Sequence, residues 1–348
     1  MAEFDRLAVK PPLPPMEAKL VHALPSGDGW QYEPKWDGFR CLVFRDGGSV
    51  HLQSKSGKPL GRYFPEMVES VLAMDADRFV ADGELLIPVG DELSFEALQL
   101  RLHPAESRVR KLAAETPARL MLFDLLFHKE TRYIEAPLAL RRKGLELLEL
   151  GDAGDSVQLS PCSLDRDRAQ SWLDEVGDAL DGVVAKRLDG GYEPGERAML
   201  KVKKMRTADC VVGGFRYGTR SREAGSLLLG LYGDDGRLHH VGFASTAGMA
   251  DLAGLTRRLE ALVEPPGFTG DAPGGPSRWS TERTGEWEPL RTELVAEVRY
   301  DHVSGRRFRH GTKFLRWRPD KSPGQCRMDQ LRPEAAADAL AAQLKARS

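Results

Sequence analysis

Hydrophobic and polar residues alternate in short runs along the first two hundred positions of the chain. After an extended, proline-rich opening at 1–28, strand-like runs are predicted at WQYEPK, FRCLVF and SVHLQS, with a turn at Asp46-Gly47-Gly48. Apolar residues at 64, 67, 68, 71 and 72 have the spacing of a helix. Because this mixture lacks a regular strand–helix–strand repeat, we predict an α+β fold with antiparallel sheets and flanking helices.

The same pattern predicts the remaining elements of this half. RFVADGELLIP is a predicted strand, 94–115 is predicted to be helical, and RLMLFDLLF at 119–127 is a long apolar strand. Pro137 is expected at the N1 position of a helix that continues through Leu150. Strands at 182–187 and 198–204 complete this half of the chain.

The pattern changes near Arg206, where strands predominate. Five strands with one helix at 249–263, after the third strand, give the element order of an OB-fold barrel, and 264–278 is a Pro/Gly-rich loop. We therefore predict one domain at 1–205 and an OB-fold domain at 206–348 that ends in an alanine-rich helix. The predicted barrel strands are CVVGGFRYG, GSLLLGLYG, LHHVGFAS, ELVAEVRY and KFLRW.

Composition excludes several classes of protein. Apolar residues make up 41% and charged residues 29%, which is typical of a globular protein. No run approaches 18 apolar residues and MAEFDRLAVKPPLPP lacks the apolar stretch of a signal peptide, so we expect a cytoplasmic protein without a membrane span. The four cysteines are scattered, which favours reduced thiols and no structural zinc.

The net charge of −2 conceals two basic blocks. Residues 184–222 hold 10 Lys/Arg against 4 Asp/Glu, and residues 299–332 hold 10 against 3. The blocks therefore carry +6 and +7, and the rest of the chain is acidic. Such blocks either bind a polyanion or form ordinary solvated faces, and charge alone does not decide between the two.

Candidate chemistry begins at Lys35-Trp36-Asp37-Gly38-Phe39-Arg40, between two predicted strands. A lysine amine attacks phosphorus only when deprotonated, and lowering its pKa from about 10.4 to about 7.5 takes roughly 4 kcal/mol. Neighbouring cations or a desolvated pocket supply that bias. Lys201 and Lys203, at i and i+2 on one face of a strand, are candidates for those cations and for binding phosphate. The alternative is a hairpin turn at Asp37-Gly38 with exposed charges.

Further stretches with chemical potential follow in order along the chain. Each alone has a structural explanation, such as core packing for Phe123 or a surface ion pair for Glu84. Together they are more specific than any single one. They are Ser54-Lys55-Ser56-Gly57, Asp82-Gly83-Glu84, Phe123-Asp124, Asp181-Gly182-Val183-Val184-Ala185-Lys186 before the Lys201/Lys203 pair, and Arg316-Trp317-Arg318-Pro319-Asp320-Lys321.

In this order the stretches resemble the motifs of the covalent nucleotidyltransferase superfamily, which comprises DNA ligases, RNA ligases and mRNA capping enzymes. The resemblance covers residues from about 10 to 325. EPKWDGFR, RYFPE, DGVVAKR and FLRWRPDKSPGQC are most similar to the small bacterial ATP-dependent DNA ligase C group, close to the ligase module of bacterial ligase D. The resemblance implies an adenylation domain and an OB-fold domain that together seal 3′-OH/5′-phosphate nicks in duplex DNA through a lysyl-AMP intermediate.

The resemblance also implies roles for individual residues. Lys35 would attack the α-phosphorus of ATP and hold AMP. Lys201 and Lys203 would bind the α-phosphate, and Arg318 and Lys321 would close over the β- and γ-phosphates. The catalytic set is thus Lys35, Lys201, Lys203, Arg318 and Lys321.

Nucleotide and metal contacts follow from the same resemblance. Glu33 would select adenine, Phe123 would stack on it, and Arg40 and Glu84 would contact the ribose or a metal-bound water network. Glu84 and Asp181 would hold Mg²⁺, or Mn²⁺ as an alternative, because these ions take oxygen ligands. The nucleotide-binding set is Glu33, Asp37, Arg40, Lys55, Glu84, Phe123, Asp181, Lys186, Lys201 and Lys203.

Two positions depart from the pattern of the superfamily. Lys55 stands where arginine is usual, so a bidentate contact to phosphate is lost. Asp181 stands where glutamate is common, and its side chain is one methylene shorter.

The implied partner is nicked duplex DNA, bound through its backbone without sequence preference. The motifs begin only 34 residues into the chain, so we expect no additional N-terminal DNA-binding domain. By family analogy, we also expect the protein to be a monomer that acts in repair at the bacterial nucleoid, with repair primase-polymerases or end-binding proteins as partners. The alternatives are an RNA ligase, a capping-type nucleotidyltransferase, and a non-catalytic nucleic-acid-binding protein with a ligase-like fold.

Overall fold

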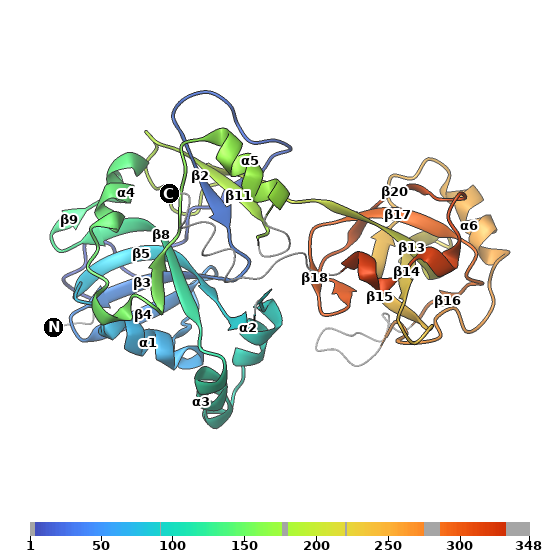
Figure 1. The fold of residues 1–348 in the computed structure, drawn as a ribbon, viewed down its shortest axis with the longest axis horizontal. Coiled ribbons are helices and arrows are strands. Elements are labelled where there is room, and N and C mark those ends of the chain that lie inside the picture. The colour runs from blue at the N-terminus through green and yellow to red at the C-terminus, as the bar shows by residue number, and fades with distance from the viewer. Residues whose placement is uncertain (1–3, 91, 176–179, 220, 275–285, 332–348) are drawn as a thin grey trace. The chain divides into compact units, whose positions relative to one another are not determined.

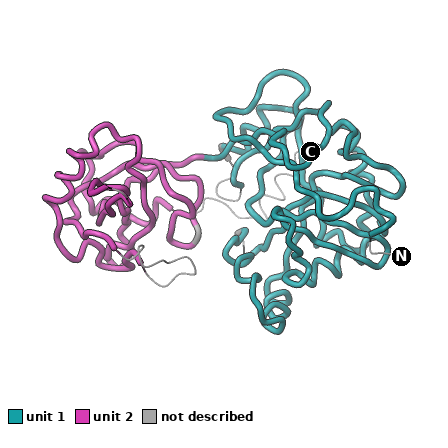
Figure 2. Tube along the Cα trace, turned by 180° about the vertical axis from the view of Figure 1, so that it is seen from behind, with its two compact units in different colours: residues 1–204, 333–348 teal, residues 205–332 magenta. Residues whose placement is uncertain are grey.

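The computed structural model describes residues 4–90, 92–175, 180–219, 221–274 and 286–331. The described chain forms two compact units, one ending at Lys204 and the other beginning at Met205 (Figure 2). The C-terminal helix expected at 333–347 lies outside the described residues. None of the described helices is both long enough and apolar enough to cross a bilayer.

The larger sheet of unit 1 has the strand order β10-β8-β5-β3-β4, with β9 added at β8 (Figure 1). Its strands are antiparallel except for the β10–β8 pair. Both faces are covered, because Cys41 and Val43 belong to one buried cluster and Leu42 and Phe44 to another. This explains the nearly continuous apolar run of β8. The bounds are β3 Phe39–Asp46, β4 Ser49–Ser54, β5 Arg78–Leu86, β8 Arg119–His128, β9 Thr131–Arg132 and β10 Val157–Leu159.

A second sheet of unit 1 has the order β1-β12-β11-β2. Its register places Lys35, the last residue of β2, and Lys203, the last of β12, on either side of Gly182. Gly182 has a φ of +145°, and a side chain there would collide with the carbonyl oxygen of Val202. The glycine therefore lets three strand ends converge. The bounds are β1 Ala18–Leu20, β2 Trp30–Lys35, β11 Gly182–Arg187 and β12 Met199–Lys203.

The helices of unit 1 differ in detail from the predicted ones. The region 94–115 forms two helices, because Pro104 disfavours helical geometry at the residue before it. Pro137 is the N-cap of its helix and not its N1 residue. The elements are η1 Gly61–Tyr63, α1 Pro65–Leu72, β6 Pro88–Val89, β7 Glu92–Leu93, α2 Phe95–Arg101, α3 Glu106–Glu115, α4 Leu138–Glu146, η2 Gly151–Ala153 and α5 Arg166–Glu175.

Unit 2 is a closed barrel with strands in the order β14-β15-β20-β17-β13, and β13 pairs with β14 to close it. The β15–β20 pair is parallel, and α6 follows β15 in the chain and precedes β16 and β17. This is OB-fold topology, so the predicted α+β fold with an OB-fold barrel is confirmed. The bounds are β13 Arg206–Tyr217, β14 Ala224–Tyr232, β15 Leu238–Ser245, α6 Leu252–Glu260, β16 Glu288–Pro289, β17 Val295–Tyr300, β18 Val303–Ser304, β19 Arg307–Phe308, β20 Thr312–Trp317, η4 Pro323–Gln325 and η5 Met328–Leu331.

Candidate active site

A cavity of about 190 Å³ in unit 1 is lined by residues from both sheets. The wall combines aromatic and aliphatic side chains with basic ones, which suits a flat ring attached to phosphate. Eight of the residues singled out from the sequence line this cavity: Glu33, Lys35, Arg40, Lys55, Glu84, Phe123, Lys186 and Lys201. Asp37, Asp181, Lys203, Arg318 and Lys321 are not part of this wall.

Lys35 lies at the edge of the cavity and pairs with a carboxylate. Its Nζ is 2.6 Å from Asp181 Oδ2, and Lys203 Nζ is 3.4 Å from Asp181 Oδ1. The backbone N–H of Asp181 donates to the carbonyl of Lys35 at 2.9 Å, so β2 and the start of β11 are tied at this point. The side chain of Lys35 is 23% exposed and therefore accessible to a bound molecule.

Positive charge converges on the same corner. Burial, followed by the charges of Lys35 and Lys203, lowers the pKa of Lys201. Three lysines thus lie close enough to repel one another, with Asp181 as the carboxylate among them. An anion such as a phosphate bound here would relieve that repulsion.

Glu84 contributes a second carboxylate to the cavity wall. Burial raises its pKa to about 7, while the charges of Arg40 and Lys35 act in the opposite direction. A carboxyl group poised near neutrality ionises readily when a cation approaches. Among the described residues, no three Asp, Glu, His or Cys side chains cluster as a metal site. The two carboxylates expected from the sequence to hold a metal, Glu84 and Asp181, offer oxygen donors of the kind that Mg²⁺ takes together with bound waters.

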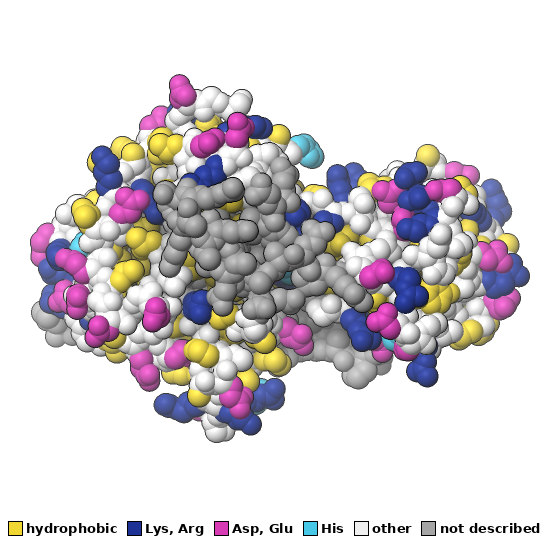
Figure 3. All heavy atoms as spheres, in the orientation of Figure 1, with side chains coloured by type: hydrophobic (Ala, Val, Ile, Leu, Met, Phe, Trp, Pro, Cys, Tyr) yellow, Lys and Arg dark blue, Asp and Glu magenta, His cyan; other side chains and the backbone are white. Residues whose placement is uncertain are grey.

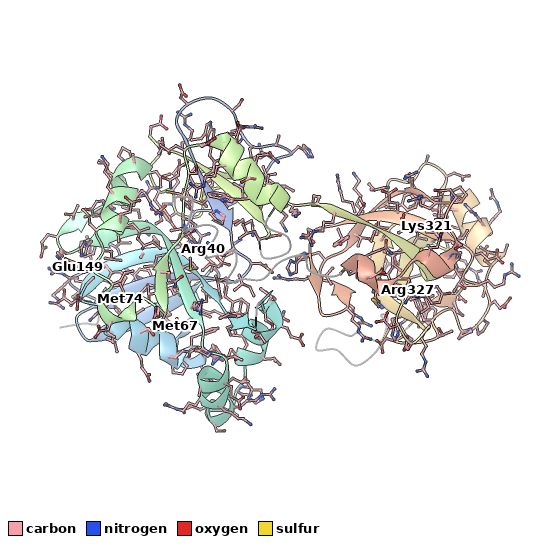
Figure 4. The ribbon with its side chains drawn as sticks, in the orientation of Figure 1. Arg40, Met67, Met74, Glu149, Lys321 and Arg327 are labelled. Carbon is pink, nitrogen blue, oxygen red and sulfur yellow. The ribbon has the colours of Figure 1, made fainter. Side chains whose placement is uncertain are left out.

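Arg40 reaches from β3 toward the cavity and is held by a buried carboxylate (Figure 4). Its Nε and Nη2 donate to the two carboxylate oxygens of Asp82 at 2.6 and 2.5 Å. Burial alone would lower the pKa of Arg40, but Asp82 raises it above its ordinary value. The guanidinium carbon lies 4.7 Å from the centroid of the Phe123 ring.

Glu33 lines the cavity and belongs to a buried network. Lys186 Nζ is 2.8 Å from Glu33 Oε2, and Gln31 Nε2 donates to Glu33 Oε1 at 2.8 Å. Lys186 also donates to the carbonyl of Phe123 at 3.3 Å and lies 4.8 Å from its ring centroid. The acid and the aromatic ring are therefore fixed by the same lysine.

Two predicted residues have different surroundings. Lys55 pairs with Glu17 at 3.0 Å on an exposed rim, and this hydrogen bond lowers the pKa of Glu17. Asp37 acts on the cavity through its charge, as one of the groups that raise the pKa of Glu84.

Arg318 and Lys321 belong to a carboxylate-centred cluster in unit 2. Asp209 accepts from Arg318 Nη1 at 2.9 Å and from Lys321 Nζ at 2.8 Å. Asp320 forms a two-pronged pair with Arg318; it raises the pKa of Arg318, and its own pKa is lowered to about 2. Gln330 fixes the backbone of Asp209 on both sides, at 3.0 and 3.2 Å. The two cations are thus held side by side.

Sequence reasoning missed part of the wall. The segment Pro15–Ala18, together with Val184 and Met199, lines the cavity. Met199 lies two residues before Lys201 on the same strand, so strand alternation could have identified it. The proline-rich opening gives no such signal, because contacts with distant parts of the chain, among them the pairing of β1 with β12, place it here.

Two protein-family models match the chain. The model described as "ATP dependent DNA ligase domain" matches residues 15–203, and the one described as "ATP dependent DNA ligase C terminal region" matches residues 220–321. The chain is similar to DNA ligase C2 of Mycolicibacterium smegmatis, with 47% identity over 341 residues that cover 93% of this chain and 96% of that protein. It is 44% identical over 343 residues to DNA ligase C of Mycobacterium tuberculosis, with 94% and 95% covered.

More distant likenesses agree with these. The chain is 30% identical over 332 residues to the multifunctional non-homologous end joining protein LigD of Mycobacterium bovis, which covers 93% of this chain but 40% of LigD. A solved structure of a Lig E DNA ligase shares the fold, with a TM-score of 0.51 and 15% identity over 87% of this chain and 99% of that one.

Proposed function

The chain belongs to the ATP-dependent DNA ligases, and we propose that Lys35 is the residue that carries AMP from ATP to the DNA. Enzymes of this family seal nicks through a covalent adenylate, so the RNA ligase, capping and non-catalytic alternatives are set aside. One observation above all supports the choice of Lys35. It is the lysine of β2 at the edge of a cavity that also contains Phe123, Glu84 and Lys201.

The first step begins with the opening of an ion pair. Lys35 must give up one proton, to the carboxylate of Asp181 or to water, and move away from Asp181 before its lone pair can attack, because an ammonium group is no nucleophile. A bond then forms between Lys35 Nζ and the α-phosphorus, and the bond from that phosphorus to the bridging oxygen breaks. Pyrophosphate leaves with that electron pair. Lys201 and Lys203 hold the α-phosphate and stabilise the charge that develops on it.

The nucleotide is held by the cavity wall. Phe123 stacks on the adenine ring, and Glu33 selects the base while Lys186 and Gln31 fix its carboxylate. Arg40 and Glu84 contact the ribose or waters around it. The rim residues Asp37 and Lys55 complete the set that we propose for nucleotide binding.

Glu84 and Asp181 are the residues that would hold Mg²⁺, or Mn²⁺ in its place. Such an ion would neutralise phosphate charge. Because Asp181 also pairs with Lys35, engagement of this carboxylate elsewhere would release the amine. The side chain of Asp181 is one methylene shorter than the glutamate common at this position, and it is compatible with both roles, pairing with Lys35 and holding a metal ion.

In the later steps the 5′-phosphate of the nick attacks the phosphorus of AMP and frees Lys35, and the 3′-hydroxyl then expels AMP. Arg318 and Lys321 bind the β- and γ-phosphates during the first step and orient pyrophosphate for departure. On the face of unit 2 seen in Figure 3, basic side chains lie among acidic ones. The exposed Arg306, Arg307 and Lys313 are the residues of the second basic block that we propose for contacts with the DNA backbone.

We further propose that residues 1–205 form the adenylation domain and 206–348 the OB-fold domain of a monomer. The likeness to an end joining protein supports a repair role, with a primase-polymerase or an end-binding protein as partner and the bacterial nucleoid as the place of action.

The test is adenylation followed by mapping. Protein incubated with labelled ATP and Mg²⁺ should gain one AMP on Lys35, Lys35→Ala should gain none, and Lys129→Ala, an exposed lysine, should behave as wild type. Lys35→Ala should still bind nicked duplex DNA with the same salt dependence. Labelling from GTP alone, or AMP mapped to another lysine, would contradict the proposal.

A further inference from the structure

The opening segment of the chain forms part of the cavity wall and is held at Met16 from two directions. The backbone N–H of Met16 donates to Tyr192 Oη at 3.0 Å, and Arg40 Nη2 donates to the carbonyl of Met16 at 3.2 Å. Met16 is 3% exposed, so these partners take the place of water. The position of this wall therefore depends on two side chains that are distant in sequence.

Tyr192 and Arg40 meet at one carboxylate. Tyr192 Oη donates to Asp82 Oδ2 at 2.6 Å, and Arg40 grips both oxygens of Asp82. Asp82 is 0% and Tyr192 4% exposed. A closed circuit results, which runs from the N–H of Met16 through Tyr192, Asp82 and Arg40 back to the carbonyl of Met16.

A tyrosine hydroxyl is suited to the centre of this circuit, because it donates one hydrogen bond and accepts others. Burial, followed by the charge of Asp82, raises the pKa of Tyr192 well above its usual value, so the hydroxyl keeps its proton. The residue is seated by its own backbone, whose N–H donates to the carbonyl of Ile134 at 2.9 Å. The hydroxyl therefore holds the Met16 segment of the wall directly and the Arg40 guanidinium through Asp82.

We propose that Tyr192 is a positioning residue for nucleotide binding. It fixes the distance between the Met16 segment of the cavity wall and the Arg40 guanidinium. Tyr192 is not one of the residues that line the cavity, so it acts through Asp82 and Met16. It lies outside the motif stretches that carry the known chemistry. The inference rests on the proposed function, in which this cavity takes ATP and Arg40 contacts it.

Tyr192→Phe removes the hydroxyl and keeps the ring. It leaves Asp82 without one donor and the N–H of Met16 without its acceptor. The expected result is a KM for ATP in self-adenylation raised about tenfold, because one hydrogen bond to a charged group is worth about that factor. The rate at saturating ATP should stay within about twofold, since Lys35 is untouched. Amide exchange at Met16 should accelerate in the same variant.

Tyr133→Phe is the matched control, because Tyr133 lies in unit 1 outside the cavity wall. It should leave the KM for ATP unchanged. The double variant Tyr192→Phe/Asp82→Asn should have a KM for ATP close to that of the more impaired single variant, because both changes break the same chain of hydrogen bonds. Fully additive effects would show that the two residues act separately and would overturn the proposal.

Folded Tyr192→Phe protein with an unchanged KM would also overturn it. If Tyr192→Phe does not fold, Asp82→Asn gives the same measurement from the other end of the hydrogen bond, with the same expected rise in KM. Labelling of wild-type Lys35 by ATP separates the two failures. An unlabelled Lys35 refutes the proposed function, whereas a labelled Lys35 with an unaffected KM in the variant refutes only the role of Tyr192.

Discussion

Lys186→Met tests whether the buried network of Lys186, Glu33 and Asp124, beside the wall proposed to bind adenine, stabilises unit 1. The lysine amine lies 2.8 Å from Glu33 Oε2 and 3.8 Å from Asp124 Oδ2, and the three side chains are 4%, 3% and 1% exposed. At an effective dielectric of about 20, a pair at this distance attracts with about 6 kcal/mol. Methionine has a similar length but no charge, so the substitution leaves Glu33 with Gln31 as its remaining partner.

We expect Lys186→Met to lower the free energy of unfolding of unit 1 by about 3–5 kcal/mol, because the cost of an uncompensated buried charge exceeds the net worth of the pair. For a unit of this size, that corresponds to a fall in Tm of roughly 6–20 °C. Calorimetry measures this fall in Tm. The unfolding transition whose Tm rises when ATP is added would be assigned to unit 1.

Lys129→Met is the control, since its pair with Glu149 at 2.7 Å is exposed and should be worth at most about 1 kcal/mol. The double variant Lys186→Met/Glu33→Gln should recover at least about 1 kcal/mol of the loss, because it also removes the stranded charge. Two results would contradict this expectation. Lys186→Met would lower the free energy of unfolding no more than Lys129→Met, or the double variant would lower it by the sum of the two single effects.

Three other predictions address pH and the second unit. The pKa of Glu84 is raised to about 7, so its carboxyl group is protonated below that pH and charged above it. The KM for ATP should therefore fall as the pH rises from about 6 to about 8. Glu84→Gln should flatten this pH profile, and a higher Mg²⁺ concentration should move its midpoint to lower pH. Burial lowers the pKa of His240 to about 3, so the contribution of neutral His240 to stability is complete above about pH 6.5 and is lost as the pH falls. Between pH 7.5 and pH 5, His240→Phe should therefore lose about 2 kcal/mol less unfolding free energy than the wild type, as measured by urea unfolding at the two pH values. Asp209→Asn should slow self-adenylation by about tenfold or more, because it weakens the hold on two cations, yet spare the sealing of a pre-adenylated nick; equal losses in both assays would contradict the role of Arg318 and Lys321 in the first step.

Much of the fold could be predicted from the sequence, for reasons that particular segments make clear. The long strands of the barrel and of the larger sheet carry apolar or alternating runs, and α6 begins at Leu252, directly after Asp251, whose side chain caps it. By contrast β1 and β10 have three residues each, and their partners lie far away in the chain. Tertiary pairing forms such strands, and local pattern does not.

The candidate site shows the same division. The motif stretches of unit 1 led to most of the polar wall of the cavity, because they lie on or next to strands that line it. Their mutual contacts were not predictable, since register decides them. Cations were expected next to Lys35, whereas its nearest charged neighbour is Asp181, brought there by the pairing of β2 with β11. Asp209 was missed because a single acid in an apolar strand has no visible partner until the barrel closes.

The sheet that carries Lys35 is built from the two ends of unit 1. β1 and β2 come from the first 35 residues, and their partners β12 and β11 come from the last stretch of the unit, up to Lys203. During synthesis, β2 must wait for about 150 further residues before its neighbour exists, and closure of so long a loop is slow. On the proposed function, the nascent chain would bind ATP only after Lys201 has left the ribosome, so the nucleotide would stabilise only a completed unit.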